Sequence, residues 1–151
     1  MLREKSLTLA TAESCTGGLI GHRLTQVSGS SDYYKEGFVV YSNEAKMDRL
    51  GVEPQLIEKF GAVSEPVAQA MAQGVCRVTG ADIGVSVTGI AGPSGGSDLK
   101  SVGLTYIAVH DRSGTHCRKF VFTHDRGRNK ERAAQAALNL VRLRIQGEPG
   151  A

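Results

Sequence analysis

Short apolar runs alternate along the chain with longer stretches of helical periodicity. Short runs rich in β-branched and small residues are typical of strands. The strands predicted in this way are 7–12, 38–41, 81–88, 102–110 and 116–123. Stretches with apolar residues three and four positions apart are typical of helices, particularly where serine or proline precedes them and glycine follows. The helices predicted in this way are 18–26, 42–51, 54–60, 64–80 and 128–145. The run at 38–41 is apolar throughout, which predicts a buried strand.

The order of these elements predicts the fold class. Strands alternate with helices through most of the chain, and the turn at 111–114 joins the last two strands as a hairpin. This order predicts an α/β (α+β) three-layer sandwich, with a mixed β-sheet and helices on both of its faces. With 151 residues the chain is expected to form a single domain, 1–151, with an ordered core at about 6–145. The end, 146–151, is expected to be frayed.

The composition excludes several classes of protein. The net charge of +3 is small, and the basic residues concentrate in the last third of the chain. This distribution suits a phosphorylated ligand better than a long nucleic-acid track, and the absence of tryptophan argues against a base-stacking platform. The three cysteines lack CxxC spacing, and no stretch has the apolar length of a membrane span. We therefore expect a cytoplasmic protein that binds neither membrane nor nucleic acid.

A serine stands in a glycine-rich turn between the first predicted strand and the first predicted helix. The turn reads ESCTGG over 13–18 and contains Ser14. Where a strand leads through such a turn into a helix, free backbone N–H groups and the positive end of the helix dipole point at the turn. This geometry suits a nucleophilic serine beside an oxyanion or another anion. An ordinary helix cap uses the same residue types, so both interpretations stand at this point.

Two further predicted strands end in polar or flexible sequence. The second ends at Tyr41 and Ser42, and the third ends at Thr88, before a loop that has four glycines within 89–96. Ligands of open α/β sheets collect beyond the carboxyl ends of strands, so we expect these two ends and the Ser14 turn to face one cleft. The glycine loop is either a flexible connection or a backbone grip on a ligand. Its sequence is neither a P-loop nor a dinucleotide fingerprint.

Lys46 is the residue that can activate Ser14. It follows the second strand, on the first turn of a predicted helix. A serine nucleophile needs a neighbour that takes its proton, and a lysine does so when it is held neutral. We expect burial under the glycine loop, and repulsion by basic residues of the last helix, to lower the pKa of Lys46. Alone, such a lysine is more often a solvated surface residue. The four histidines offer neither a Ser-His-Asp arrangement nor metal-ligand spacing, and we expect no metal and no cofactor.

Basic residues crowd the start of the last predicted helix. They are Arg126, Arg128, Lys130 and Arg132. The helix dipole disfavours cations at this end of a helix. Their presence there indicates either a solvated basic face or an anionic ligand that compensates their charge.

Six motifs, taken in order, resemble those of one known family. They are AESCTGG (12–18), GSS (29–31), YSNEAK (41–46), GAVSEPVAQAMA (61–72), VTGIAGPSGG (87–96) and DRGRNKERAAQAAL (125–138). This combination resembles the C-terminal domain of the CinA family of competence/damage-inducible proteins, whose stand-alone version is the nicotinamide-nucleotide amidohydrolase. The resemblance implies metal-free hydrolysis of the carboxamide of nicotinamide mononucleotide (NMN) by a serine–lysine dyad. The matching positions here are Ser14 and Lys46. An assisting basic residue, usually an arginine, matches Lys130.

Together these observations predict a serine amidohydrolase. Ser14 would attack the amide carbon, and neutral Lys46 would take its proton. Backbone N–H groups of 16–18, or of the loop 89–92, would bind the oxyanion, and Tyr41 and Ser31 would orient the lysine. The residues predicted to bind substrate are Cys15, Thr16, Gly17, Gly18, Ser31, Thr88, Gly89, Ala91, Gly92 and Arg126. We also expect a homo-oligomer. The alternative is a non-catalytic module that senses nucleotides or binds a partner in the competence and DNA-damage response.

Overall fold

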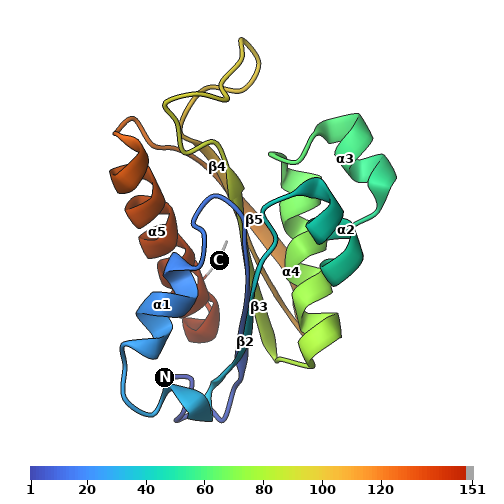
Figure 1. The fold of residues 1–151 in the computed structure, drawn as a ribbon. Helices are drawn as coiled ribbons and strands as arrows, with labels where there is room; N and C mark the ends of the chain where they lie inside the picture. Colours follow the sequence, from blue (N-terminus) through green and yellow to red (C-terminus); the bar gives the residue numbers. More distant parts are fainter. Residues whose placement is uncertain (149–151) are drawn as a thin grey trace.

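A mixed five-stranded sheet forms the centre of the computed structural model, which describes residues 1–148 (Figure 1). Its strands are β1 (Leu9–Glu13), β2 (Tyr34–Val39), β3 (Ile83–Gly89), β4 (Leu104–Asp111) and β5 (Gly114–Val121). Their order across the sheet is β2-β1-β3-β4-β5. β1 runs parallel to both of its neighbours, whereas the β3–β4 and β4–β5 pairs are antiparallel. The three parallel strands therefore end at the same edge of the sheet.

Helices cover both faces of this sheet. α1 (Leu19–Thr25) and α5 (Arg126–Gln146) pack together on one face. α4 (Glu65–Thr79) covers the other face, with α2 (Asn43–Leu50) and α3 (Pro54–Phe60) packed against it (Figure 1). A short 3₁₀ turn, η1 (Ser30–Asp32), leads into β2. The predicted α/β three-layer sandwich with a mixed sheet is confirmed. None of the described helices combines the length and the apolar character that a bilayer crossing requires.

The helix that carries Lys46 begins and ends where its sequence signals place it. The Ser42 side chain caps α2 by accepting a hydrogen bond from Ala45 N at 3.1 Å. Gly51 ends the helix in the left-handed conformation, with φ of 63°. These two caps fix Lys46 on the first turn, where its side chain is only 1% exposed.

Small residues let α4 approach both α2 and the sheet closely. A Cβ on Gly74 of α4 would collide with the Leu50 carbonyl oxygen of α2, and a Cβ on Gly84 of β3 would collide with the Ala72 carbonyl oxygen of α4. Ala68 and Ala72 are fully buried where α4 packs on the sheet. These small residues account for the close packing of α4 on the sheet.

The second strand differs from its prediction. The apolar run 38–41 predicts a buried strand, but β2 begins at Tyr34, ends at Val39 and forms an edge of the sheet. Val39 is 53% exposed, and burial begins only after the strand, at Val40. Apolar composition describes the side chains of a strand, whereas its place in the sheet depends on which strands it pairs with.

The two ends of α5 also differ from their predictions. The helix begins at Arg126, two residues before the predicted start, because the Asp125 side chain caps it by accepting from Arg128 N at 3.0 Å. The predicted frayed end, 146–151, includes Gln146, which is still helical, and residues 149–151 lie outside the described part.

Candidate active site

The carboxyl ends of β1, β2 and β3 meet at one edge of the sheet, which is the usual ligand site of an open α/β fold. Ser14 follows β1 directly, and its amide donates to Val87 O of β3 at 3.0 Å. The chain leaves β2 at the same edge and turns into α2, which carries Lys46. The glycine loop leaves β3 there and projects beyond the sheet (Figure 1). The structure thus gathers the three strand ends that the sequence singled out.

Ser14 and Lys46 lie within hydrogen-bonding distance of each other. Lys46 Nζ donates to Ser14 Oγ at 3.3 Å. Both residues are buried, with exposed fractions of 1% for the lysine and 8% for the serine. The same Nζ donates to the carbonyl oxygens of Val40 at 2.9 Å, Tyr41 at 3.2 Å and Ser42 at 3.3 Å. These carbonyl groups hold the amine against the serine hydroxyl.

Burial holds the pKa of Lys46 below its ordinary value, because the charged amine loses water. The charges of Cys15 and Glu44 oppose this shift by raising the pKa. Repulsion by the basic residues of α5, which the sequence led us to expect, is not among the causes of the shift. Lys130, for example, lies beside Gly17. Its charge lowers the pKa of the Cys15 thiol and is not among the causes that shift the pKa of Lys46. Burial alone therefore favours the neutral amine that a general base requires.

A buried carboxylate occupies the amino end of α1. Glu13 is 1% exposed; its Oε2 accepts from Gly18 N at 3.0 Å and Ile20 N at 3.1 Å, and its Oε1 accepts from Gly21 N at 2.8 Å. The Gly17 amide donates to Ser14 O at 3.0 Å. The predicted use of the Gly17 and Gly18 amides for an oxyanion is therefore wrong, because both are engaged inside the protein. Sequence reasoning missed Glu13, whose only signal is an acidic residue between an apolar strand and a helix.

The glycine loop is held over the site by α5. Asn129, which is 3% exposed, donates through Nδ2 to Ala91 O at 3.0 Å. Arg126 donates to Gly92 O at 2.9 Å and to the Tyr41 hydroxyl at 3.2 Å, so it joins the loop to the end of β2. Sequence reasoning also missed Asn129, because a polar residue in a basic helical stretch gives no sign of burial.

A few backbone amides at this edge have no acceptor within the described part of the chain. Within residues 1–148, the N–H groups of Thr16, Ala91 and Gly92 donate to no protein acceptor. Thr16 belongs to the Ser14 turn, and the other two belong to the glycine loop that faces it. They are the candidate donors to an oxyanion formed at the carbon that Ser14 attacks.

Two of the four basic residues at the start of α5 reach the site. One is Arg126, through the contacts described above. The other is Lys130, whose Nζ lies 3.6 Å from the position of a Cβ on Gly17, and hence over the Ser14 turn. Arg128 instead pairs with Asp125 at 3.6 Å. Arg132 is exposed. The site therefore has a cationic rim made of Arg126 and Lys130.

Several predicted side chains are not placed for the roles predicted for them. Ser31 belongs to η1, which precedes β2, whereas Ser14 follows β1. Because β1 and β2 are parallel, the two serines lie at opposite ends of the sheet, and Ser31 does not orient Lys46. The Thr88 hydroxyl donates to Ala62 O at 2.8 Å, inside the protein. Tyr41 contacts the lysine through its carbonyl oxygen and not through its hydroxyl.

Cys15 is a packing residue and not a rival nucleophile. It is 6% exposed, and a Cβ on Gly89 would lie 3.1 Å from its Sγ. Burial raises the pKa of the thiol to about 11, so the reactive thiolate is scarce at neutral pH. The Cβ on Gly89 would also meet Thr105 Oγ1 at 2.7 Å and Leu104 O at 2.9 Å, so Gly89 makes room chiefly for β4.

The histidines do not provide the base. The His110 ring binds Thr115 through Nδ1 at 2.8 Å, in the hairpin of β4 and β5. His22 on α1 and His124 before α5 are exposed, and His116 lies on β5. Nor does any group of three or more His, Cys, Asp or Glu side chains within residues 1–148 stand where it could hold a metal ion. Lys46 is the titratable side chain in hydrogen-bonding contact with Ser14.

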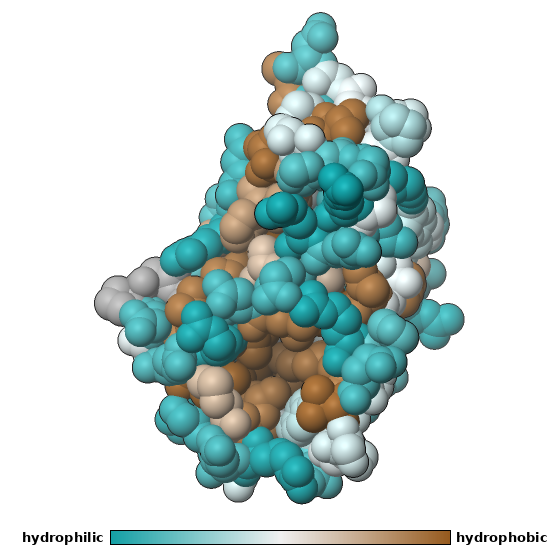
Figure 2. Space-filling view, turned by 90° about the vertical axis from the view of Figure 1, so that its left-hand side faces the viewer, coloured by the Kyte–Doolittle hydropathy of each residue, from teal (hydrophilic) through white to brown (hydrophobic). Residues whose placement is uncertain are grey.

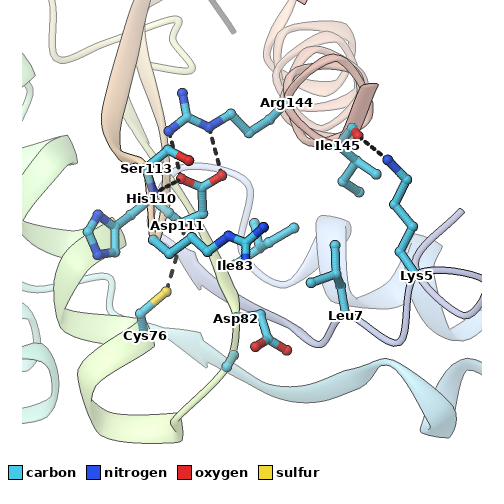
Figure 3. Close-up of a pocket in the computed structure, with 12 residues that line it drawn as sticks. Lys5, Leu7, Cys76, Asp82, Ile83, His110, Asp111, Ser113, Arg144 and Ile145 are labelled. Carbon is cyan, nitrogen blue, oxygen red and sulfur yellow. Dashed lines mark hydrogen bonds and ion pairs between the residues drawn. The ribbon is translucent and has the colours of Figure 1, made fainter. Parts of the chain in front are cut away.

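Two other hollows lie away from this edge. A cavity of about 600 Å³ opens at the opposite end of the sheet, where Asp111 pairs with Arg144 at 2.7 Å and Lys5 donates to Ile145 O at 2.7 Å (Figure 3). A hollow of about 330 Å³ has a largely apolar lining that includes residues of α1 and α5 (Figure 2). The larger hollow is lined by Ser113 and by basic residues such as Lys5 and Arg144, but it lies away from the three strand ends. We place the chemistry at Ser14, whose hydroxyl contacts the buried amine of Lys46.

Comparisons with known proteins agree on one family. The family model named CinA C-terminal domain matches residues 1–145. A CinA-like protein of Chloroherpeton thalassium is 52% identical over 146 residues, which cover 94% of this chain and 35% of that protein. A CinA-like protein of Salinibacter ruber is 53% identical over 141 residues, 93% of this chain and 34% of that protein. The chain thus spans about a third of the length of these curated relatives.

Solved structures of similar proteins share the fold. The competence/damage inducible protein CihA from Agrobacterium tumefaciens superposes with a TM-score of 0.91 at 41% identity, covering 93% of this chain and 86% of that chain. A CinA superfamily protein from Escherichia coli superposes with a TM-score of 0.90 at 35% identity, covering 93% of this chain and 81% of that chain.

Proposed function

The chain belongs to the CinA C-terminal domain family, and we propose that it is a serine amidohydrolase that converts NMN into nicotinate mononucleotide and ammonia. The observation that carries the proposal is the 3.3 Å distance between Ser14 Oγ and the Nζ of buried Lys46. A hydroxyl beside an amine that burial biases toward its neutral form is a nucleophile with its own base. The choice of NMN rests on the resemblance of the six motifs.

Acylation uses the pair directly. Ser14 Oγ attacks the carboxamide carbon of NMN while neutral Lys46 Nζ takes the hydroxyl proton. The carbonyl oxygen becomes an oxyanion, and free amides of Thr16, Ala91 or Gly92 donate to it. Lys46 then gives the proton to the amide nitrogen. The C–N bond breaks, ammonia leaves, and the nicotinoyl group stays on Ser14 as an ester.

Deacylation reverses the roles of the same groups. A water molecule attacks the ester carbon and gives a proton to Lys46 Nζ. The bond between the acyl carbon and Ser14 Oγ breaks, and Lys46 returns the proton to the serine oxygen. Nicotinate mononucleotide leaves as the carboxylate, and its acid proton passes to water or to the released ammonia. Each turnover therefore consumes one water and restores both side chains.

The phosphate of the substrate suits the cationic rim of Arg126 and Lys130. The amino end of α1, a usual place for an anion, is filled by Glu13. Lys130 stands where the family commonly has an arginine, and it supplies a point charge without the planar fork of a guanidinium. Arg126 supplies such a fork, but it also holds Gly92 and Tyr41.

Incubation of the purified chain with NMN tests the proposal. We expect ammonia and nicotinate mononucleotide to appear in equal amounts, measured by an enzymatic ammonia assay and by chromatography. Release of free nicotinamide would instead indicate attack on the glycosidic bond. A chain that binds NMN without turnover would be the nucleotide-sensing or partner-binding module.

Chelation should leave the activity unchanged. The pair Ser14–Lys46 supplies both nucleophile and base, so the reaction needs no Lewis acid to activate water. We expect the initial rate of ammonia release after dialysis against EDTA to stay within about twofold of the untreated rate. A loss that zinc or magnesium restores would contradict the serine–lysine mechanism.

A further inference from the structure

The side chain of Glu13 ties the end of β1 to the start of α1 across the Ser14 turn. Glu13 is the last residue of β1, and its carboxylate reaches forward to the amides of Gly18, Ile20 and Gly21 at 3.0, 3.1 and 2.8 Å. It is 1% exposed, and it makes no ion pair within residues 1–148. Backbone amides are thus its only hydrogen-bond donors in the described part of the chain.

The turn that Glu13 spans has few backbone hydrogen bonds of its own. Gly17 and Gly18 have φ of 63° and 96°, angles that a glycine adopts but does not enforce. The backbone bonds inside the turn are Gly17 N to Ser14 O at 3.0 Å and the longer Leu19 N to Thr16 O at 3.4 Å. The carboxylate adds three hydrogen bonds that tie the end of β1 to Gly18 and to the first residues of α1, across the turn.

We propose that Glu13 is a positioning residue that holds Ser14 Oγ and the Thr16 amide in the geometry of attack. It does so through the amides of Gly18, Ile20 and Gly21, and it does not contact the substrate. An error of about 1 Å in the place of a nucleophile can cost about 10²-fold in rate, so the stiffness of the turn bears directly on kcat. The readout by turnover rests on the proposed function. The readouts by labelling and by hydrogen exchange do not.

The test compares Glu13→Gln with Glu13→Asp and with the matched control Asp82→Asn. Glutamine keeps the shape of the side chain, but its NH₂ group cannot accept from a backbone N–H. Aspartate keeps the charge at a shorter reach. Asp82 also accepts a backbone hydrogen bond, from Thr8 N at 2.8 Å, beyond the start of β1 and at the opposite end of that strand. The control therefore removes the charge of a carboxylate that accepts from a backbone amide away from Ser14.

Three quantities are measured below the melting temperature of every variant. They are kcat and KM for NMN, the rate at which diisopropyl fluorophosphate labels Ser14, and the amide hydrogen exchange of Gly17. In Glu13→Gln we expect kcat and the labelling rate to fall at least about tenfold, with KM within about threefold. The Gly17 amide, which Glu13 does not touch, should exchange faster. The values for Glu13→Asp should lie between those of the wild type and those of Glu13→Gln. Asp82→Asn should stay within about twofold of the wild type on every measure.

Each outcome decides the proposal. A folded Glu13→Gln protein with unchanged rates and unchanged Gly17 exchange overturns it, as does an equal loss in Asp82→Asn, which would indicate general destabilisation. If Glu13→Gln does not fold, Glu13→Asp is judged by the same criteria. If the wild-type chain is labelled at Ser14 but does not hydrolyse NMN, the proposed function fails, and labelling still decides the role of Glu13. If nothing is labelled, Gly17 exchange decides it.

Discussion

We expect Ser14→Ala to abolish ammonia release from NMN, with a fall in kcat of at least about 10⁴-fold. The variant lacks the attacking oxygen, and Cys15 cannot replace it because its thiol is buried and its pKa is raised to about 11. The fold should survive. Ser14 Oγ makes one hydrogen bond within residues 1–148, at 3.3 Å to Lys46, so its loss should cost about 1 kcal/mol of unfolding free energy or less. Ammonia assays and thermal unfolding of the same preparation measure both effects.

Ser31→Ala is the matched control for this prediction. Ser31 belongs to the GSS motif, but it lies in η1, at the other end of the sheet. Its replacement should leave turnover within about twofold of wild type, because no reacting group lies near it. Wild-type turnover by a clean Ser14→Ala preparation would remove Ser14 as the nucleophile.

The sequence predicts those parts of the site that depend on local signals, such as turn glycines and helix caps. The glycine turn after an apolar run predicts where Ser14 stands, and the pair Ser42 and Gly51 predicts where α2 begins and ends. The helix start then places Lys46 on the first turn beyond the second strand. Because β1 and β2 proved to be parallel neighbours, these two local predictions were enough to bring the serine and the lysine to one edge.

The parts that the sequence does not predict depend on tertiary contacts. In the sequence, Glu13 is an ordinary polar residue at a strand end, and its bonds to the start of α1 exist only in the folded chain. Asn129 is likewise one polar residue in a basic helix, and its bond to the glycine loop is a tertiary contact. The role expected for Ser31 failed because a motif does not say at which end of the sheet its loop lies. The burial expected for β2 failed because strand order is set by pairing across the sheet.

The second large effect concerns Lys46 and pH. We expect kcat/KM for NMN to rise with pH through an apparent pKa below the value of about 10.4 for a free lysine. Below that pKa the amine carries a proton and cannot accept another from Ser14, and above it the amine is neutral. Burial lowers the pKa of Lys46, so the active form appears at a lower pH than for an exposed lysine. A neutral amine has two N–H groups for the carbonyls of Val40 and Tyr41, and its lone pair remains for the serine proton.

Lys46→Arg should be inactive over the whole pH range, because a guanidinium keeps its proton in proteins. Thermal unfolding of the variant separates a loss of chemistry from a loss of fold. A folded, active Lys46→Arg enzyme would mean that the lysine only positions the substrate. Tyr41, whose hydroxyl is bound by Arg126, would then be the first alternative base.

Two substitutions separate the causes of the shifted pKa. The charge of Glu44 raises the pKa of Lys46, so Glu44→Gln should move the rising limb of the pH profile to lower pH. The shift should be small, because Glu44 is exposed and water screens its charge. Lys130→Met should leave the limb in place even where it lowers the rate, since the α5 cations are not among the causes of the shift. If Lys130→Met moves the limb to higher pH, the cations of α5 repel the Lys46 proton, and burial is not the leading cause.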